Sequence, residues 1–292
     1  MELFRALGLL IEPPAPEHSS IAEVLGLPSV PDAAAYATDI SFQRYPFASV
    51  YLGPEGMMGG EARARIVGFW SALGLDVPEE PDHLSALLSL LATLDEQSAE
   101  ETDPAHKALL EEARSTLLWE HLMAWAVPYL TSFSTCREPF YQQWGTLVEN
   151  ALREASGAAG LPGYVPGALL ELAPLEDPRS GGGGDAFLKA LLAPGRSGFV
   201  ILRDDLAEAA DALGLALRAG ERRYALTAFF AQDPGRTLDW MAFFSERWLD
   251  RLGGREGGGV ILDWWKRRAA YTTALLRDLA TDSGPWEEAV VS

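Results

Sequence analysis

The residues most suited to chemistry stand in one short run, 80–84, which reads Glu-Pro-Asp-His-Leu. Proline fits the first turn of a helix, carboxylates there favour the helix dipole, and a histidine titrates near neutral pH. The residue types alone allow two interpretations. In the structural one, Asp82 accepts backbone N–H groups as a helix cap and His83 is an exposed flank. In the functional one, the same side chains contact a ligand or partner.

Two acid-x-x-histidine pairs raise the question of a metal site. Glu80 with His83, and Asp103 with His106, have the spacing of one half of a di-iron carboxylate site in a helical bundle. That site needs carboxylates from two further helices, and both pairs contain proline at a helix start. Cys136 is the only cysteine, which excludes an intramolecular disulfide and a cysteine-based cluster. No metal site is therefore predicted, and an enzyme using these histidines stays an alternative.

Other catalytic patterns are missing from the sequence. The glycine-rich runs 53–60 and 181–184 are not followed by the Lys-Ser/Thr that a phosphate-binding loop requires. No G-x-S-x-G elbow is present, and Cys136 lies in no cysteine-protease signature. We therefore predict no catalytic residues and no cofactor.

The chain is strongly acidic. Its 292 residues include 23 Lys and Arg against 42 Asp and Glu, for a formal net charge of -19. The surplus lies mainly in residues 1–150, which hold 7 basic and 22 acidic side chains; residues 151–292 hold 16 and 20. A nucleic-acid partner is excluded on this ground, because phosphate contacts need a basic surface, and a basic partner is favoured.

The elements that position these side chains are predicted to be helices. Apolar residues recur at helical spacing along most of the chain, and only 198–202 looks like a strand. The fold class is therefore all-α. Pro128 should kink or end its helix, and Gly74 fits a left-handed C-cap. Helices are expected near 62–73, 80–94, 104–129, 139–155, 186–193, 203–218, 221–231, 236–252 and 260–281.

Three regions follow from this pattern. Residues 1–155 form a helical domain, within which 12–32 is a Pro-rich arm. Residues 156–185 are a Gly/Pro-rich, flexible connector, and residues 186–292 form a helical region that completes or extends the bundle. The start lacks the pattern of a signal peptide, and the longest charge-free run of interest, 121–136, is 16 residues, short of a membrane span of about 20. We expect a cytoplasmic protein without stable membrane insertion.

The stretch from Tyr45 to Leu152 resembles the TorD/DmsD/NarJ family of chaperones for molybdenum redox enzymes. The pieces of the resemblance come in family order. They are Tyr45-Pro46-Phe47, Phe69-Trp70 with Leu73-Gly74-Leu75, Glu80-Pro81-Asp82-His83-Leu84, Glu120-His121-Leu122 with Trp125, and Pro139-Phe140-Tyr141.

The resemblance implies a TorD-like helical bundle without catalytic activity. Its partner would be the apo catalytic subunit of a molybdopterin oxidoreductase, together with that subunit's twin-arginine leader peptide. It marks a client-binding site with an apolar groove and an acidic rim, of which Trp70, Trp125 and Tyr141 would be wall residues. The implied site residues are Glu80, Pro81, Asp82, His83, Trp70, His121, Trp125 and Tyr141. A metal-dependent helical enzyme and a scaffold without an enzyme client are the alternatives, and the sequence is compatible with a monomer or a homodimer.

Overall fold

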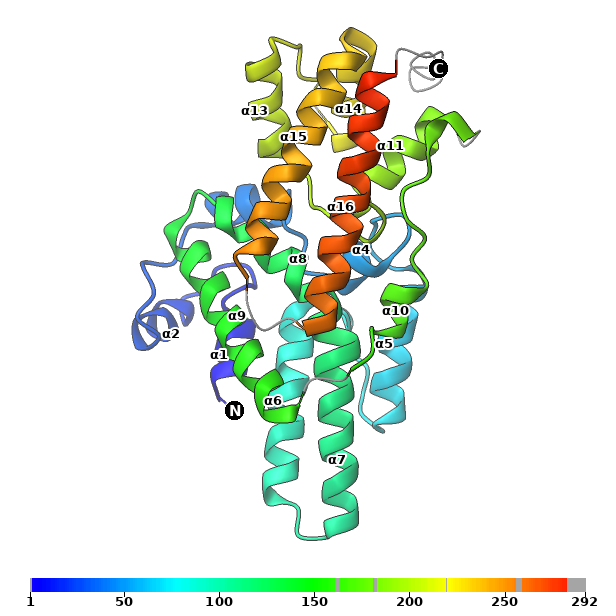
Figure 1. The fold of residues 1–292 in the computed structure, drawn as a ribbon. Helices are drawn as coiled ribbons and strands as arrows, with labels where there is room; N and C mark the ends of the chain where they lie inside the picture. The colour runs from blue at the N-terminus through cyan, green and yellow to red at the C-terminus, as the bar shows by residue number, and fades with distance from the viewer. Residues whose placement is uncertain (1, 161–162, 181–182, 219, 256–258, 283–292) are drawn as a thin grey trace.

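The computed structural model describes residues 2–160, 163–180, 183–218, 220–255 and 259–282 (Figure 1). Within these residues the chain forms helices and no β-strand, which confirms the all-α prediction. The first part comprises α1 (Glu2–Leu9), α2 (His18–Val24), α3 (Ala33–Tyr36), the π-helical η1 (Ala37–Ser41), α4 (Ala48–Leu52), α5 (Gly60–Ala72), α6 (Leu84–Glu100), α7 (Pro104–Thr116), the π-helical η2 (Leu117–Met123), α8 (Ala124–Ser132), the 3₁₀ turn η3 (Phe133–Thr135) and α9 (Pro139–Ala159). The second part comprises α10 (Gly167–Leu170), the 3₁₀ turn η4 (Pro178–Ser180), α11 (Gly184–Leu192), α12 (Pro194–Ser197), α13 (Arg203–Leu213), α14 (Arg222–Gln232), α15 (Pro234–Gly253) and α16 (Gly259–Thr281).

Helices α6 and α7 form a long hairpin that extends from the body of the molecule (Figure 1). On α6, the leucines that recur at helical spacing are all buried; they are Leu84, Leu87, Leu88, Leu91 and Leu94. Helix α1 packs against α6 and α9. The indole N–H of Trp144, in α9, donates to the backbone carbonyl of Leu7 at 2.9 Å. This buried bond joins the start of the chain to its fourth long helix.

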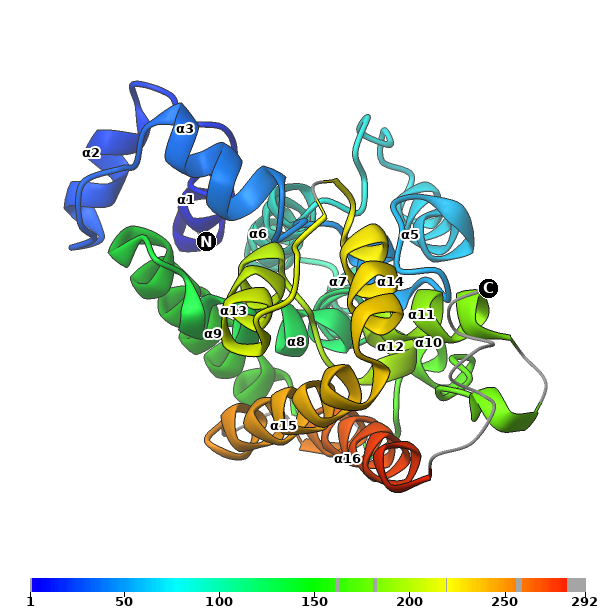
Figure 2. The ribbon, with the colours of Figure 1, turned by 90° about the horizontal axis from the view of Figure 1, so that it is seen from above.

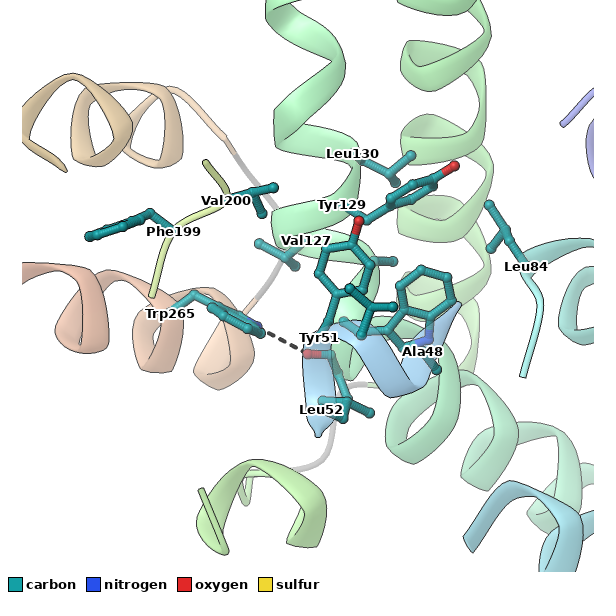
Figure 3. Close-up of a cluster of buried hydrophobic side chains, with 14 of the residues drawn as sticks. Ala48, Tyr51, Leu52, Leu84, Val127, Tyr129, Leu130, Phe199, Val200 and Trp265 are labelled. Atoms are coloured by element: carbon teal, nitrogen blue, oxygen red, sulfur yellow. Dashed lines mark hydrogen bonds between the residues drawn. The ribbon is translucent and has the colours of Figure 1, made fainter. Parts of the chain in front are cut away.

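Pro128 was predicted to kink or to end its helix, and it does not end it. Helix α8 continues to Ser132. Proline has no N–H, so the carbonyl of Ala124, one turn earlier, loses its partner. The indole N–H of Trp265, in α16, donates to that carbonyl at 3.0 Å, along the dashed line from Trp265 in Figure 3. A residue 141 positions away therefore satisfies the backbone group that Pro128 leaves open.

The C-terminal helices pack on the first part of the chain. Helices α15 and α16 lie side by side, and α16 contacts α8 and α12 (Figures 1 and 2). Gly198 has a φ of +85°, and a β-carbon there would lie 2.3 Å from the backbone nitrogen of Ala269 in α16. The segment that looked like a strand, 198–202, is buried and pairs with no strand of the described chain. Gly198 lies against α16, and the ring of Phe199 packs on that of Phe244 in α15.

One continuous hydrophobic cluster runs through the molecule, from Phe4 in α1 to Leu279 in α16. Figure 3 shows its centre, where Tyr51 and Tyr129 of the first part lie near Trp265 of the second. The rings of Tyr51 and Tyr129 meet edge to face with centroids 5.7 Å apart. The two parts of the chain therefore share one core.

Several connecting regions differ from their predictions. The expected arm 12–32 contains the short helix α2. The part of the expected flexible connector that the structure describes, 163–180, is fastened to the body: Leu169 and Leu175 are buried, and Arg268 donates to the carbonyl of Leu172 at 2.7 Å. Positions 161–162 and 181–182 of that connector lie outside the described residues.

Helix α13 is shorter than its predicted range of 203–218. It ends at Leu213, because Gly214 adopts a left-handed conformation with φ +63°.

Candidate functional site

The Asp82–His83 turn, residues 80–84, connects α5 to α6 and is held by α4. The carboxylate Oδ2 of Asp82 accepts the backbone N–H of Ser49 at 3.1 Å, and its carbonyl accepts that of Ala48 at 2.9 Å. These are first-turn N–H groups of α4, whose own N-cap residue, Phe47, has no side-chain acceptor. The expected amide contacts of Asp82 are present, but the helix it caps is α4 and not the helix that follows it.

His83 is the N-cap residue of α6, and it is 4% exposed rather than a solvent-facing flank. Its Nδ1 accepts the backbone N–H of Ser85 at 3.2 Å. Its ring meets that of Phe47 edge to face, with centroids 4.9 Å apart. Phe47 and His83 also form an isolated antiparallel bridge, in which the N–H of Leu84 donates to the carbonyl of Pro46 at 2.8 Å. The histidine is thus fixed through both backbone and ring.

A serine and a carboxylate complete the surroundings of His83. The Ser85 hydroxyl lies 2.8 Å from Nδ1 and within hydrogen-bond distance of the carboxylate of Glu12, which itself lies 3.4 Å from Nδ1. Its single proton serves one of these two acceptors at a time. In a nucleophilic triad the histidine contacts the serine through one ring nitrogen and the acid through the other. Here both partners meet the same nitrogen. The three residues therefore do not form a hydrolase relay.

Burial lowers the pKa of His83 below its usual value, and the negative charges of Glu12, Glu80 and Asp82 oppose that shift. The neutral ring fits its role as a cap, because an Nδ1 that accepts a backbone N–H carries no proton. The ring's other nitrogen, Nε2, forms no hydrogen bond to the part of the chain that the structure describes. Nε2 is not among the fully enclosed polar atoms without a partner in the described chain, although His83 as a whole is only 4% exposed.

Helix α5 fastens the turn from a second side. The indole N–H of Trp70 donates to the carbonyl of Pro81 at 3.2 Å. Arg63 donates to the carbonyl of Glu79 at 2.9 Å, and its Nε lies 3.9 Å from Oδ1 of Asp82. Pro81 is buried, whereas Glu80 is exposed. The structure therefore brings Trp70 together with the predicted residues 80–83.

The other predicted site residues lie elsewhere in the core. His121, in η2, packs its ring 4.6 Å from that of Phe69. Trp125 is fully buried, stacks on Tyr51 with centroids 5.4 Å apart, and donates to the carbonyl of His121 at 2.7 Å. Tyr141 is also buried. Trp125 and Tyr141 do not border an open groove in this structure, so their role as wall residues stays a prediction.

Burial and the positive charge of Arg65 lower the pKa of His121 to about 4. The ring is therefore neutral at physiological pH. Burial likewise raises the pKa of Tyr141 and of the Cys136 thiol, which keeps both groups protonated. None of these side chains is activated as a base or nucleophile by its surroundings.

The residues that sequence reasoning missed are the ones that hold the turn: Glu12, Ser49, Arg63 and Ser85. Ser85 directly follows the motif, and its position in a first helical turn is a weak signal. Glu12 lies 73 positions from Ser85, and only the packing of α1 on α6 brings them together. No sequence pattern marks that contact.

The residues of the metal hypothesis do not assemble. His83 begins α6, whereas His106 lies in the first turn of α7 and contacts Glu101 at the far end of the hairpin. The length of α6, 17 residues, separates them by roughly 25 Å. Among the described residues no three His, Cys, Asp or Glu side chains are grouped so that they could bind a metal ion.

Comparison with known proteins agrees with the resemblance found in the sequence. Residues 43–130 match the model of a family described as the nitrate reductase delta subunit, which confirms the similarity to the TorD/DmsD/NarJ family over α4–α8. This is a family of chaperones for the maturation of molybdoenzymes. No curated protein sequence matches the chain. None of the helices in the described ranges has the length and apolar content that crossing a membrane requires.

Proposed function

We propose that this protein is a cytoplasmic chaperone without catalytic activity of its own. It binds the apo catalytic subunit of a molybdopterin oxidoreductase, and the twin-arginine leader peptide of that subunit, before the cofactor is inserted. The match over residues 43–130 supports this class of function. The Asp82–His83 turn is the proposed contact region for the client.

The observation that carries the proposal is how firmly this turn is held. Contacts from α4, from α5 and from Glu12 converge on residues 79–85, which fixes the directions of their polar groups. A recognition site needs such support, because a side chain that is already ordered loses less entropy on binding. Nε2 of His83 is the ring atom left open to a partner.

The charge of the chain near the turn supports a basic ligand. The chain has no lysine or arginine between Arg65 and Lys107, and within that stretch Asp76, Glu79 and Glu80 are exposed. Arg63 lies against Asp82 at the turn itself, while the exposed charged side chains of this stretch next to it in the sequence, Asp76, Glu79 and Glu80, are acidic. These carboxylates complement the consecutive arginines of a twin-arginine leader.

The test is affinity capture from the native host with the wild-type protein and a His83→Asn variant. Asparagine is a good N-cap residue, so the variant keeps an acceptor for the Ser85 N–H and retains the fold, while it loses the imidazole. We expect wild type to enrich a molybdopterin oxidoreductase subunit that lacks its cofactor. His83→Asn should recover about tenfold less, as expected for the loss of one central contact of about 1.4 kcal/mol.

The matched control is His106→Asn, which changes an exposed histidine at the far end of the α6–α7 hairpin. It should capture the same subunit as wild type. If His83→Asn and wild type recover the same amount of the client subunit, the turn has a structural role only. Capture of no molybdoenzyme subunit by the wild-type protein would reject the proposed function.

A further inference from the structure

Two adjacent methionines are exposed in the loop between α4 and α5, residues 53–59, which we call the methionine loop. Met57 is 65% and Met58 is 54% exposed. The other methionines of the described chain, Met123 and Met241, are buried. Large apolar side chains are unfavourably hydrated on a solvent-facing loop, and burial against a partner would be favourable. The exposure of two adjacent methionines therefore points to contact with a partner.

The loop is fixed next to the Asp82–His83 turn. The N–H of Gly59 donates to the hydroxyl of Ser49 at 3.1 Å, and the N–H of Ser49 donates to Asp82 at 3.1 Å. Met58 and Met57 therefore stand one and two residues away from a chain of hydrogen bonds that ends at Asp82 of the candidate site.

The middle of the loop packs against the C-terminal region. Gly56 has a φ of +64°, and a β-carbon at this position would lie 2.8 Å from Cα of Ala193. Only glycine tolerates both this conformation and this close approach. The exposure of the methionines thus belongs to a loop that is supported on both sides.

The charged residues within the loop and directly beside it in the sequence are acidic. Glu55 and Glu61 are exposed, and no basic residue lies between Arg44 and Arg63. Arg63 itself is engaged with Glu79 and Asp82. An apolar contact with an acidic margin complements a peptide in which arginines precede an apolar stretch.

We propose that Met57 and Met58 contact the apolar stretch of the client's leader peptide, while the acidic margin faces its arginines. This inference rests on the proposed function and adds the surface that receives the apolar part. Methionine suits that task, because its unbranched, polarizable side chain adapts to differing apolar partners.

The test is a titration of the full-length protein, labelled with ¹³C at the methionine methyl groups, with a synthetic peptide of two consecutive arginines followed by an apolar stretch. We expect the resonances of Met57 and Met58 to shift or broaden. Those of the buried Met123 and Met241 should stay in place. A peptide of the same composition in scrambled order is the control for unspecific hydrophobic contact.

Affinity is then compared between variants of similar exposure. The double variant Met57→Ser/Met58→Ser should bind the peptide about tenfold or more weakly than wild type, since burying one methionine side chain accounts for that factor. Leu109→Ser, which changes a residue that is 62% exposed on α7, should bind like wild type.

The outcomes separate the two proposals. If His83→Asn weakens binding while the methyl resonances stay in place and the double variant binds like wild type, the methionine loop is rejected and the proposed function stands. If the wild-type protein does not bind the peptide, both the leader contact and this inference are rejected. Client capture by the same protein would then still test the chaperone function.

Discussion

At the scale of single residues, Asp82 and His83 each stabilise a helix start, and they do so for different helices. Asp82 accepts the N–H of Ser49 at the beginning of α4, and His83 accepts that of Ser85 at the beginning of α6. These two neighbouring residues thereby connect the start of α4 to the start of α6. This explains why the structural and functional interpretations of the motif are compatible: the contacts that cap the helices also fix the side chains in place.

His121 offers a test of the buried polar groups by pH. Its pKa is about 4 in the folded protein, below the usual value of 6.5 in the unfolded chain. The unfolded state therefore binds a proton first as the pH falls. The free energy of unfolding therefore includes the full contribution of the neutral His121 ring above pH 6.5. As the pH falls from 6.5 to 4, the free energy of unfolding decreases by about 3 kcal/mol because of this group.

The variant His121→Leu removes this titration. We expect its free energy of unfolding, measured by urea denaturation, to fall less than that of wild type between pH 6.5 and 4. Parallel pH profiles of wild type and His121→Leu would show that His121 does not titrate with the lowered pKa.

At the scale of elements, the long helices could be predicted and the short ones could not. The spacing of apolar residues indicated α5, α9, α15 and α16 within a few residues of their observed ends. It also indicated α6, but that helix begins at Leu84 and continues to Glu100, beyond the predicted end near 94. Helices α1 to α4 have 4 to 8 residues, too few turns to establish a period. They are stabilised by tertiary contacts such as the bond from Trp144 to Leu7.

The same limit applies to the candidate site. Residues 80–83 were identified because they are adjacent in the sequence and resemble a family motif. Their supports are distant: Ser49 lies 33 positions from Asp82, and Glu12 lies 73 from Ser85. Local patterns do not encode such pairs, because they arise when α1 and α4 pack against the region that starts α6.

The Pro128 contact gives a prediction at the level of the helix. Trp265→Phe removes the donor to the buried carbonyl of Ala124, and an unsatisfied group of this kind costs about 1–3 kcal/mol. Pro128→Ala restores a backbone N–H one turn from that carbonyl. Trp265→Phe should therefore destabilise the Pro128→Ala protein less than it destabilises wild type.

The measurement is a double-mutant cycle by chemical denaturation, in which we expect a coupling of at least about 0.5 kcal/mol. Additive effects of the two substitutions would show that the indole and the helix backbone do not depend on each other. The contribution of Trp265 would then be packing alone.

At the scale of the whole molecule, the C-terminal helices are part of the structure that supports the site. Helix α16 packs on α8, and α12 packs on α4. A β-carbon at Gly195 would lie 2.7 Å from the carbonyl of Tyr51, so α12 and α4 approach closely. Arg255 donates to the carbonyl of Leu130 at 3.1 Å and pairs with Glu149. Helix α4, which Asp82 caps, is therefore packed against residues of the C-terminal region, in α12.

This arrangement predicts that residues 1–155 do not form a stable native domain when expressed alone. Without residues 156–292, the apolar face of α8 would be exposed and the Ala124 carbonyl would lack its donor, Trp265. The fragment should keep helical far-UV circular dichroism, lose the near-UV signal of its packed aromatic residues, and bind the dye ANS, as a loosely packed state does.

Co-expression of residues 156–292 should restore the near-UV signal and abolish dye binding, because the two parts share one hydrophobic cluster. A fragment 1–155 that unfolds cooperatively, with native near-UV dichroism and no dye binding, would instead establish an independent domain. The distinction bears on function, since only in the first case does the proposed client binding at the Asp82–His83 turn depend on the C-terminal helices. Substitutions in α16 would then weaken client capture without touching the client, through the stability of α8 and α4.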